Sequence, residues 1–248
     1  MAGTPYIVDR GLVLRETETK ETDKILTLLT WGEGKISVIA RGARRKNCKF
    51  AAAAQSLAYS EWTLYQRRDW HYASDASTLE LFSGLRGDLT ALSLACYMAE
   101  LTEAVCPEAV PAPELLRHLL NGLYALSALH KPHALVKPAF ELRLLCLAGY
   151  EPLADACAIC GRENPENPVL DTAQGVVRCG SCGGGGGRPL CRDSLAALRH
   201  IVYGDPRRLY SFQMGDEALR RLSGASEAFL YAQLERGFAT LDFYKSLL

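Results

Sequence analysis

Four cysteines form two Cys-x-x-Cys pairs, Cys157/Cys160 and Cys179/Cys182, with eighteen residues between the pairs. Two thiolates three positions apart on a tight turn can point at one ion, and a second pair approaching from the far side closes a tetrahedron. This spacing predicts one Zn²⁺ ion. Four cysteine ligands leave no open position for water, so we expect the metal to be structural. Iron on the same four sulfurs remains an alternative.

The segment between the two pairs is rich in turn formers. It contains Asn-Pro at residues 164–165 and 167–168, and two short apolar runs at residues 169–171 and 176–178. This pattern predicts a short hairpin that returns to the metal. Five glycines at residues 183–187 end the module. Cys191 follows nearby, but its spacing from Cys182 fits no second knuckle.

A second cluster of side chains is cationic. Between Lys35 and Arg68 the chain carries eight basic residues and one acid, a net charge of +7 in a chain whose formal net charge is zero. Five of these bases lie in the nine residues Arg41–Lys49, which we call the basic loop. A cation cluster at the rim of a small barrel predicts contact with nucleic-acid phosphates, and a solvated surface loop is the alternative. The residues assigned to DNA are Lys35, Arg41, Arg44, Arg45, Lys46 and Lys49.

Aromatic residues flank the basic loop on the predicted strands: Trp31, Tyr59, Trp62, Tyr65, Trp70 and Tyr72. A groove that combines cations with aromatic rings is the usual means of holding single-stranded nucleic acid without reading its sequence. Burial in the core is the default for such side chains. The sequence leaves open which rings stack on bases and which pack inside.

Composition and motifs narrow the class of function. No run of eighteen apolar residues and no signal peptide is evident, so we expect no membrane span and read the nine cysteines as those of a cytoplasmic protein. No phosphate-binding loop, dinucleotide fingerprint or catalytic constellation occurs. We therefore expect a protein that is not an enzyme.

Hydrophobic periodicity predicts two kinds of architecture in sequence. Residues 1–80 contain five strand-like runs, which favour an OB-fold barrel: 7–15, 25–31, 35–40, 57–65 and 70–79. From residue 81 the period becomes helical, with helices expected at 114–129, at 140–148, from a cap at Asp193 through Val202, and at 227–247. The predicted fold is α+β and multidomain. It comprises the barrel, an α-helical domain at 81–154 and 188–248, and an inserted zinc module at 155–187.

Several short motifs in this order resemble the bacterial recombination-mediator and DNA repair family RecO. The N-terminal ones are Leu12-Val13-Leu14-Arg15, residues 21–26 (Glu-Thr-Asp-Lys-Ile-Leu), residues 34–37 (Gly-Lys-Ile-Ser) and residues 40–45 (Ala-Arg-Gly-Ala-Arg-Arg). The later ones are residues 140–145 (Phe-Glu-Leu-Arg-Leu-Leu) and residues 149–152 (Gly-Tyr-Glu-Pro), which lead into the cysteines. The resemblance covers nearly the whole chain.

The resemblance implies binding of single- and double-stranded DNA, annealing of complementary strands, and help in loading the recombinase RecA onto coated strands. It also implies two protein partners, RecR and the acidic C-terminal tail of the single-strand DNA-binding protein. For that tail we expect a groove among the helices with a cation, Arg117 or Arg143, at its edge. Many relatives carry a serine before a basic residue in the loop, where this chain has Cys48-Lys49, and a thiol is the poorer phosphate donor.

The sequence thus predicts a non-enzymatic, nucleoid-associated mediator of DNA recombination in the cytoplasm. A zinc-ribbon scaffold in transcription or RNA handling is the second hypothesis, and RNA, DNA and annealing assays would discriminate the two. A thiol oxidoreductase is the third hypothesis. A metal assay that finds one zinc ion per chain, with unreactive thiols, would exclude it.

Overall fold

The computed structural model describes residues 6–183 and 186–248, so two residues of the glycine run lie outside the described part. The chain divides into two compact units, each described by itself below. The barrel unit contains the residues up to Ala128 together with Phe238–Leu248. The cysteine unit contains Leu129–Gly237. The three-part division expected from the sequence draws its boundaries differently and stays a prediction.

The strands of the barrel are β1 (Tyr6–Thr19), β2 (Asp23–Thr30), β3 (Lys35–Ala40), β4 (Tyr59–Arg67) and β5 (Trp70–Glu80). The barrel unit also contains a 3-10 turn, η1 (Ser83–Leu85), and the helices α1 (Leu89–Val105), α2 (Pro113–Ser127) and α6 (Ala239–Ser246). The helices of the cysteine unit are α3 (His133–Leu147), α4 (Arg192–Tyr203) and α5 (Asp216–Leu234). Its short elements are β6 (Val169–Asp171), β7 (Val176–Arg178), η2 (Gly180–Cys182), β8 (Arg188–Pro189) and η3 (Pro206–Arg208).

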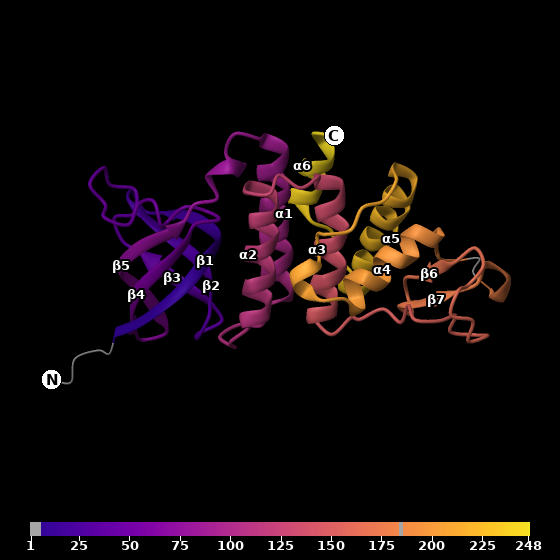
Figure 1. The fold of residues 1–248 in the computed structure, drawn as a ribbon. Helices are drawn as coiled ribbons and strands as arrows, with labels where there is room; N and C mark the ends of the chain where they lie inside the picture. Colours follow the sequence, from indigo (N-terminus) through magenta and orange to yellow (C-terminus); the bar gives the residue numbers. More distant parts are fainter. Residues whose placement is uncertain (1–5, 184–185) are drawn as a thin grey trace. The chain divides into compact units, whose positions relative to one another are not determined.

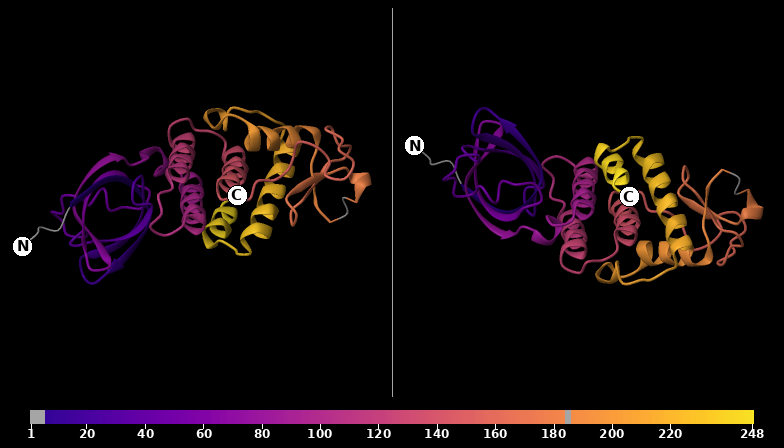
Figure 2. Two further views of the ribbon diagram at one scale, coloured as in Figure 1. Left: turned by 90° about the horizontal axis from the view of Figure 1, so that it is seen from below. Right: turned by 90° about the horizontal axis from the view of Figure 1, so that it is seen from above.

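The first five strands close into a barrel in the order β1-β2-β3-β5-β4. They are the indigo and purple strands labelled in Figure 1, and Figure 2 shows them from two further directions. This order agrees with the predicted five-stranded OB-fold. Alternation places every second side chain inside, because successive residues of a strand point to opposite faces. The core includes Leu26, Leu28, Val38, Trp62 and Leu64, all with no exposed surface.

Residues 32–34 form the turn that joins β2 and β3 as a hairpin. The Thr30 amide donates to the carbonyl of Gly34 over 2.9 Å. Gly34 has a φ of +71°, and a Cβ there would lie 2.0 Å from the carbonyl oxygen of Val110. Glycine is therefore required both for the left-handed backbone and for this close approach.

The helices that follow the barrel begin with recognisable caps. Asp88 accepts hydrogen bonds from the amides of Thr90 and Ala91 at the start of α1, over 2.8 and 3.0 Å, and α2 begins with Pro113. The Asp88 carboxylate accepts hydrogen bonds from amides that the first helical turn leaves unpaired. Proline at the start of α2 has no amide hydrogen that would need a partner. Helices α1, α2 and α6 pack together within the barrel unit.

The cysteine unit is built on α3, which packs against α4 and α5 (Figure 1). A buried ionic cluster joins α3 to α5: the Lys137 ammonium lies 2.8 Å from Glu141 and 3.2 Å from Glu227. Ser226 donates a hydrogen bond to Glu141, whose side chain has no exposed surface. The neighbouring carboxylates raise the pKa of Lys137, although burial opposes that shift most strongly.

Three helices differ from the sequence expectation. The helix expected at 140–148 begins seven residues earlier, at His133, as α3. Helix α4 begins at Arg192 with Cys191 as its cap, because Ser194 and Cys191 form a reciprocal capping box that Asp193 is not placed to make. The predicted helix 227–247 is two helices, since Glu235 adopts a left-handed conformation with φ 50° and ends α5. Phe238 is then buried against Tyr97 in the barrel unit. The apolar residues of 227–247, whose helical spacing suggested one helix, therefore pack into two separate cores.

Among the described residues, no helix is both long enough and apolar enough to cross a bilayer.

Candidate nucleic-acid interface and metal centre

The basic loop leaves β3 through a fixed turn. Gly42 has a φ of +67°, and its amide donates to the Asp23 carboxylate over 2.8 Å. Two residues later the amide of Arg44 donates to the carbonyl of Thr22 over 3.0 Å. Both acceptors lie at the turn between β1 and β2, so the start of the loop is tied to the body of the barrel.

Apolar residues of the same segment anchor it in the core. Ala43, Phe50, Ala53 and Ala54 belong to the hydrophobic core of the barrel, and Cys48 packs against it. The charged residues between these anchors are exposed. Because buried and charged residues alternate along the loop, the basic side chains lie in solvent while the backbone is fixed to the core of the barrel.

The five cations of the loop differ in how firmly they are held. Arg44 forms an ion pair with Glu18 over 3.1 Å and donates to the carbonyl of Glu21 over 3.3 Å. Arg41 lies over the ring of Tyr72, with the guanidinium carbon 4.8 Å from the ring centroid. The other three, Arg45, Lys46 and Lys49, are exposed and form no ion pair with any described residue. An exposed pair such as Arg44–Glu18 is worth little and can be exchanged for a phosphate.

Lys35 departs from the sequence expectation. Its side chain is only 11% exposed and its ammonium lies 3.1 Å from the Glu108 carboxylate. It also donates to the carbonyl of Glu103 over 2.8 Å. The structure therefore does not bring Lys35 to the surface of the basic loop, because its charge is used to join β3 to the segment around α1.

The aromatic residues named from the sequence separate into two groups. Trp62 has no exposed surface and is part of the core, and Trp31 is half-buried and donates its indole N–H to the Tyr59 hydroxyl over 2.8 Å. Tyr65, Trp70 and Tyr72 are on outward positions of β4 and β5. The sequence analysis did not name Tyr6, because Tyr6, Ile7 and Val8 form an unbroken apolar run. Only the structure shows that Tyr6 and Val8 are exposed while Ile7 packs on the core.

The two candidates for a partner tail belong to different units. Arg117 is an exposed residue of α2 in the barrel unit, and its guanidinium carbon lies 5.5 Å from the ring centroid of Trp31. Arg143 belongs to the cysteine unit and is half-buried there. Its guanidinium donates to the carbonyls of Ile201 and Val202 over 3.5 and 2.9 Å, at the C-terminal end of α4.

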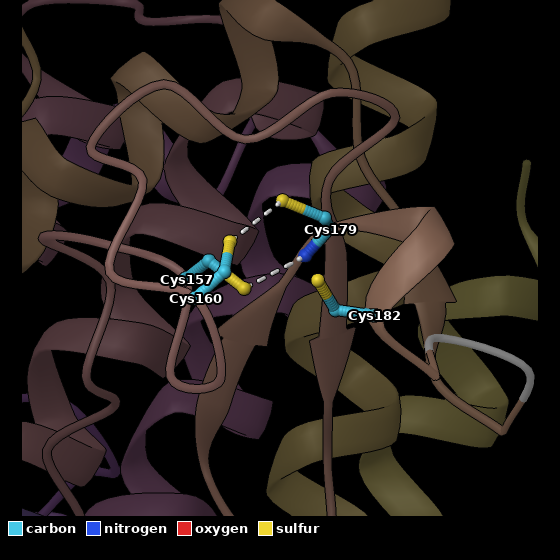
Figure 3. Close-up of side chains that lie close together, drawn as sticks. All are labelled: Cys157, Cys160, Cys179 and Cys182. Carbon is cyan, nitrogen blue, oxygen red and sulfur yellow. Dashed lines mark hydrogen bonds between the residues drawn. The ribbon is translucent and has the colours of Figure 1, made fainter.

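The four cysteines predicted as ligands come together in the cysteine unit. Their sulfur atoms all lie within 4.8 Å of one another, and Figure 3 shows the four side chains directed at a common centre. The sulfurs of Cys160 and Cys179 are 3.7 Å apart. A tetrahedral Zn²⁺ with bonds of about 2.3 Å separates its sulfurs by about 3.8 Å, so the donor set fits a four-coordinate metal ion.

Each pair of cysteines is shaped by its own turn. The amide of Gly161 donates to the carbonyl of Cys157 over 2.9 Å, and the amide of Cys182 donates to that of Cys179 over 3.1 Å. Between the turns, β6 and β7 form the predicted hairpin, with Leu170 opposite Val177 and both fully buried. The hairpin thus brings the turn with Cys179 and Cys182 back to the turn with Cys157 and Cys160.

Long polar side chains tie the cysteine module to the helices of its unit. Arg199 of α4 donates to the carbonyls of Ala154 and Asp155 over 2.6 and 2.8 Å, and also to that of Glu163. Gln233 of α5 donates to the carbonyl of Thr172 over 2.9 Å. The module is therefore inserted between helices, as the sequence predicts, and bonded to both α4 and α5.

The environment of the cysteines favours a bound cation. Backbone amides, chiefly that of Cys160 and then those of Cys179 and Ile159, lower the pKa of the Cys157 thiol to about 6. Burial raises the pKa of Cys179 to about 12. One thiolate is thus stabilised by the backbone while a second, crowded beside it, needs a positive ion to lose its proton. Cys191 is not one of the clustered residues and caps α4.

Two family models match the chain. Residues 1–82 match the family described as "Recombination protein O N terminal", and residues 86–242 match "Recombination protein O C terminal". The chain belongs to the RecO family. The two matches together span the barrel, the helices and the cysteine module, so the resemblance noted from short motifs is confirmed over nearly the whole chain.

Curated RecO relatives are similar over almost their full length. A protein of Acetivibrio thermocellus named DNA repair protein RecO is 32% identical over 244 residues, which cover 98% of this chain and 97% of the relative. Relatives of the same name are 34% identical in Symbiobacterium thermophilum (98% and 97% covered) and 36% identical in Anaeromyxobacter dehalogenans (94% and 93% covered).

Proposed function

We propose that this chain is a non-enzymatic DNA-binding mediator of recombinational repair, acting in the cytoplasm at the nucleoid. It binds single- and double-stranded DNA, anneals complementary strands and assists the loading of recombinase onto protein-coated single strands. The observation that carries the proposal is the basic loop of a RecO-family barrel, where five exposed cations stand on a segment anchored in the core. These are Arg41, Arg44, Arg45, Lys46 and Lys49.

The physical basis of annealing is charge neutralisation. Two complementary strands repel each other through their phosphates, and a cationic surface that holds both lowers this repulsion and raises their local concentration. Arginines serve this purpose well because the guanidinium fork matches phosphate oxygens. No covalent bond changes, so annealing itself needs no nucleotide.

A salt series tests the proposal directly. If about five phosphates of a single strand are neutralised, the logarithm of affinity falls with the logarithm of salt concentration at a slope of about −3.5. Annealing of complementary strands, bare or coated with single-strand DNA-binding protein, is expected to fall over the same salt range. Affinity that does not respond to salt contradicts the proposal, and tighter binding to RNA with no annealing favours the scaffold hypothesis instead.

We propose that the four-cysteine cluster holds one structural Zn²⁺. The support is its geometry: the four sulfurs lie within 4.8 Å of one another, and the Cys160 and Cys179 sulfurs are separated by 3.7 Å, close to a tetrahedral edge. Metal analysis of the purified chain is expected to give one zinc per molecule. A coloured protein that contains iron would overturn this assignment.

We further propose that RecR and the acidic tail of the single-strand DNA-binding protein are its partners. Arg117 is the exposed candidate for the tail, and its position over Trp31 would let a cation and an aromatic ring receive an acidic, apolar segment. Arg143 is the second candidate, although two carbonyls already occupy its donors. Binding of a tail peptide that is lost in Arg117→Ala and kept in Arg143→Ala places the tail in the barrel unit, and the reverse result places it on α3.

A further inference from the structure

One outer face of the barrel carries aromatic rings that the core does not use. On β4 and β5 the inward positions are taken by Leu64 and Ala73, which pack into the core. The neighbouring residues, Tyr65 and Tyr72, consequently point outward. They lie opposite each other in the ladder, and their rings are stacked with centroids 5.3 Å apart and planes inclined by 15°.

The row of rings continues across the next strand and ends at the basic loop. Tyr6 of β1 lies opposite Tyr65 and meets it edge to face, with centroids 6.1 Å apart. Tyr6 is 65% exposed. At the other end of the row, Arg41 of the basic loop covers Tyr72. The tyrosines thus connect an exposed ring to the cations proposed to hold phosphates.

The hairpin between β4 and β5 extends the same face in the strand direction. Arg67 and Trp70 form the next outward pair of the ladder, because side chains two residues apart share a face. Trp70 is 42% exposed, and Arg67 and Arg68 are exposed beside a single acid, Asp69. The face therefore offers two exposed rings, Tyr6 and Trp70, with Arg41 over Tyr72 and Arg67 opposite Trp70.

We propose that this outer aromatic face, formed by Tyr6, Tyr65, Arg67, Trp70 and Tyr72, receives the unstacked bases of single-stranded DNA. This proposal rests on the proposed DNA binding and adds to it a preference for single-stranded over duplex DNA. Phosphates of either DNA form can reach the basic loop, whereas only a single strand has base faces to offer, since a duplex keeps its bases stacked inside. Trp70 and Tyr6 take the bases, and the stacked tyrosines hold Arg41 beside them.

The test compares three probes of equal length: an oligothymidylate, the same strand without bases, and a duplex. The base-free strand keeps every phosphate, so the affinity ratio of the first two probes measures base stacking alone. For the unaltered chain we expect this ratio to be about 10- to 100-fold, since stacking of each base on an aromatic ring is worth roughly a factor of 5 to 150.

The variant Tyr6→Leu/Trp70→Leu removes the two most exposed rings and no charge. It is expected to reduce that ratio to about threefold or less, while duplex affinity stays within about twofold and the salt slope is unchanged. Duplex affinity serves as the internal check that the barrel is folded. Tyr124→Leu/Tyr231→Leu is the matched control, because both of its tyrosines are similarly exposed on helices, and it is expected to leave the ratio unchanged.

Two results would overturn the inference. In one, the variant binds the base-containing and base-free strands with the same ratio as the unaltered chain. In the other, it loses affinity equally for all three probes. The proposed function fails separately, if Arg44→Ala/Arg45→Ala/Lys46→Ala leaves the affinity for every probe intact. A charge variant that weakens all probes, together with an aromatic variant that changes none, rejects the aromatic face alone.

Discussion

The basic loop of the barrel unit and the interior of the cysteine unit use the same cationic residue types in opposite ways. In the basic loop, Arg45, Lys46 and Lys49 are exposed and no described residue neutralises them. In the cysteine unit, Arg199 donates to three backbone carbonyls and Lys137 is buried between two carboxylates. A cation whose donors are satisfied inside its own fold holds that fold together, and one left in solvent remains able to bind a polyanion.

The cysteines follow the same distinction. The sulfurs of the cluster turn toward one another, and only Cys160 of the four is exposed. The sulfur atoms point to the inside of the module, where a metal ion would connect the two cysteine turns and, through them, α4 and α5. The comparison predicts that damage to the cysteine unit affects stability first, and that damage to the basic loop affects DNA binding first.

The largest expected effect is on the metal. Replacing Cys157 and Cys179 by serine is expected to remove the ion and to destabilise the cysteine unit by an amount of order 10 kcal/mol, because metal binding supplies folding free energy in small metal-bound modules. Amide hydrogen exchange on the two units measures this, with loss of protection in Leu129–Gly237. Protection lost first from the barrel strands would contradict the comparison.

Acid is expected to act in the same direction. The ion needs deprotonated thiols, so lowering the pH protonates them and releases it. Metal release followed with a zinc indicator is expected to increase as pH falls. In the metal-free protein, the Cys157 thiolate persists to a lower pH than that of Cys179, because backbone amides hold the pKa of Cys157 at about 6 and burial raises that of Cys179 to about 12. Release that increases toward alkaline pH would argue against thiolate ligation.

The buried ionic cluster gives the next effect. Lys137→Met leaves the Glu141 carboxylate buried without its cation, and is expected to destabilise the cysteine unit by about 3–5 kcal/mol. The double variant Lys137→Met/Glu141→Leu removes both charges and is expected to recover most of this loss. Chemical denaturation of the two variants provides the measurement. A double variant less stable than the single one would show that the charges are not acting as a pair.

The basic loop gives an effect of similar size on a different property. Arg44→Ala/Arg45→Ala/Lys46→Ala removes three of five expected phosphate contacts, so the salt slope is expected to change from about −3.5 to about −1.4. At about 0.1 M salt this corresponds to about 100-fold weaker binding. The matched control is Arg207→Ala/Arg208→Ala/Arg220→Ala, which removes the same charge from exposed positions of the cysteine unit. Equal losses in the two triple variants would show that net charge alone, and not the loop, binds DNA.

Arg143 gives the smallest expected effect. Arg143→Ala removes the hydrogen bonds to the carbonyls at the end of α4, and is expected to cost about 1–2 kcal/mol of stability with DNA affinity unchanged. Thermal unfolding and DNA binding on the same sample provide both readings. A loss of DNA affinity without a loss of stability would move Arg143 from a structural to a binding role.

Local sequence patterns predicted much of this structure. Alternation, helical periodicity and turn residues gave the five strands of the barrel, the hairpin at residues 169–178 and the end of α3 to within one residue of the expected 148, because these signals act over a few residues. The break between α5 and α6 was missed, because the stripe through Leu230, Leu234 and Phe238 has helical spacing and was given more weight than the local breaker Gly237. In the structure, α5 ends before Glu235, which has a left-handed backbone, and Phe238 packs against Tyr97.

By itself, the sequence determined the composition of both sites. Cysteine spacing specified a four-sulfur cluster, and the run Arg41–Lys49 specified a cationic loop, because ligand spacing and charge density are properties of short segments. Only the tertiary structure decided which charges and rings are available. Lys35 is neutralised by Glu108, far from it in the chain, and Trp62 is buried while Trp70 is exposed. Whether a charge or ring can reach a ligand depends on what packs against it, and its neighbours in space come from distant parts of the sequence.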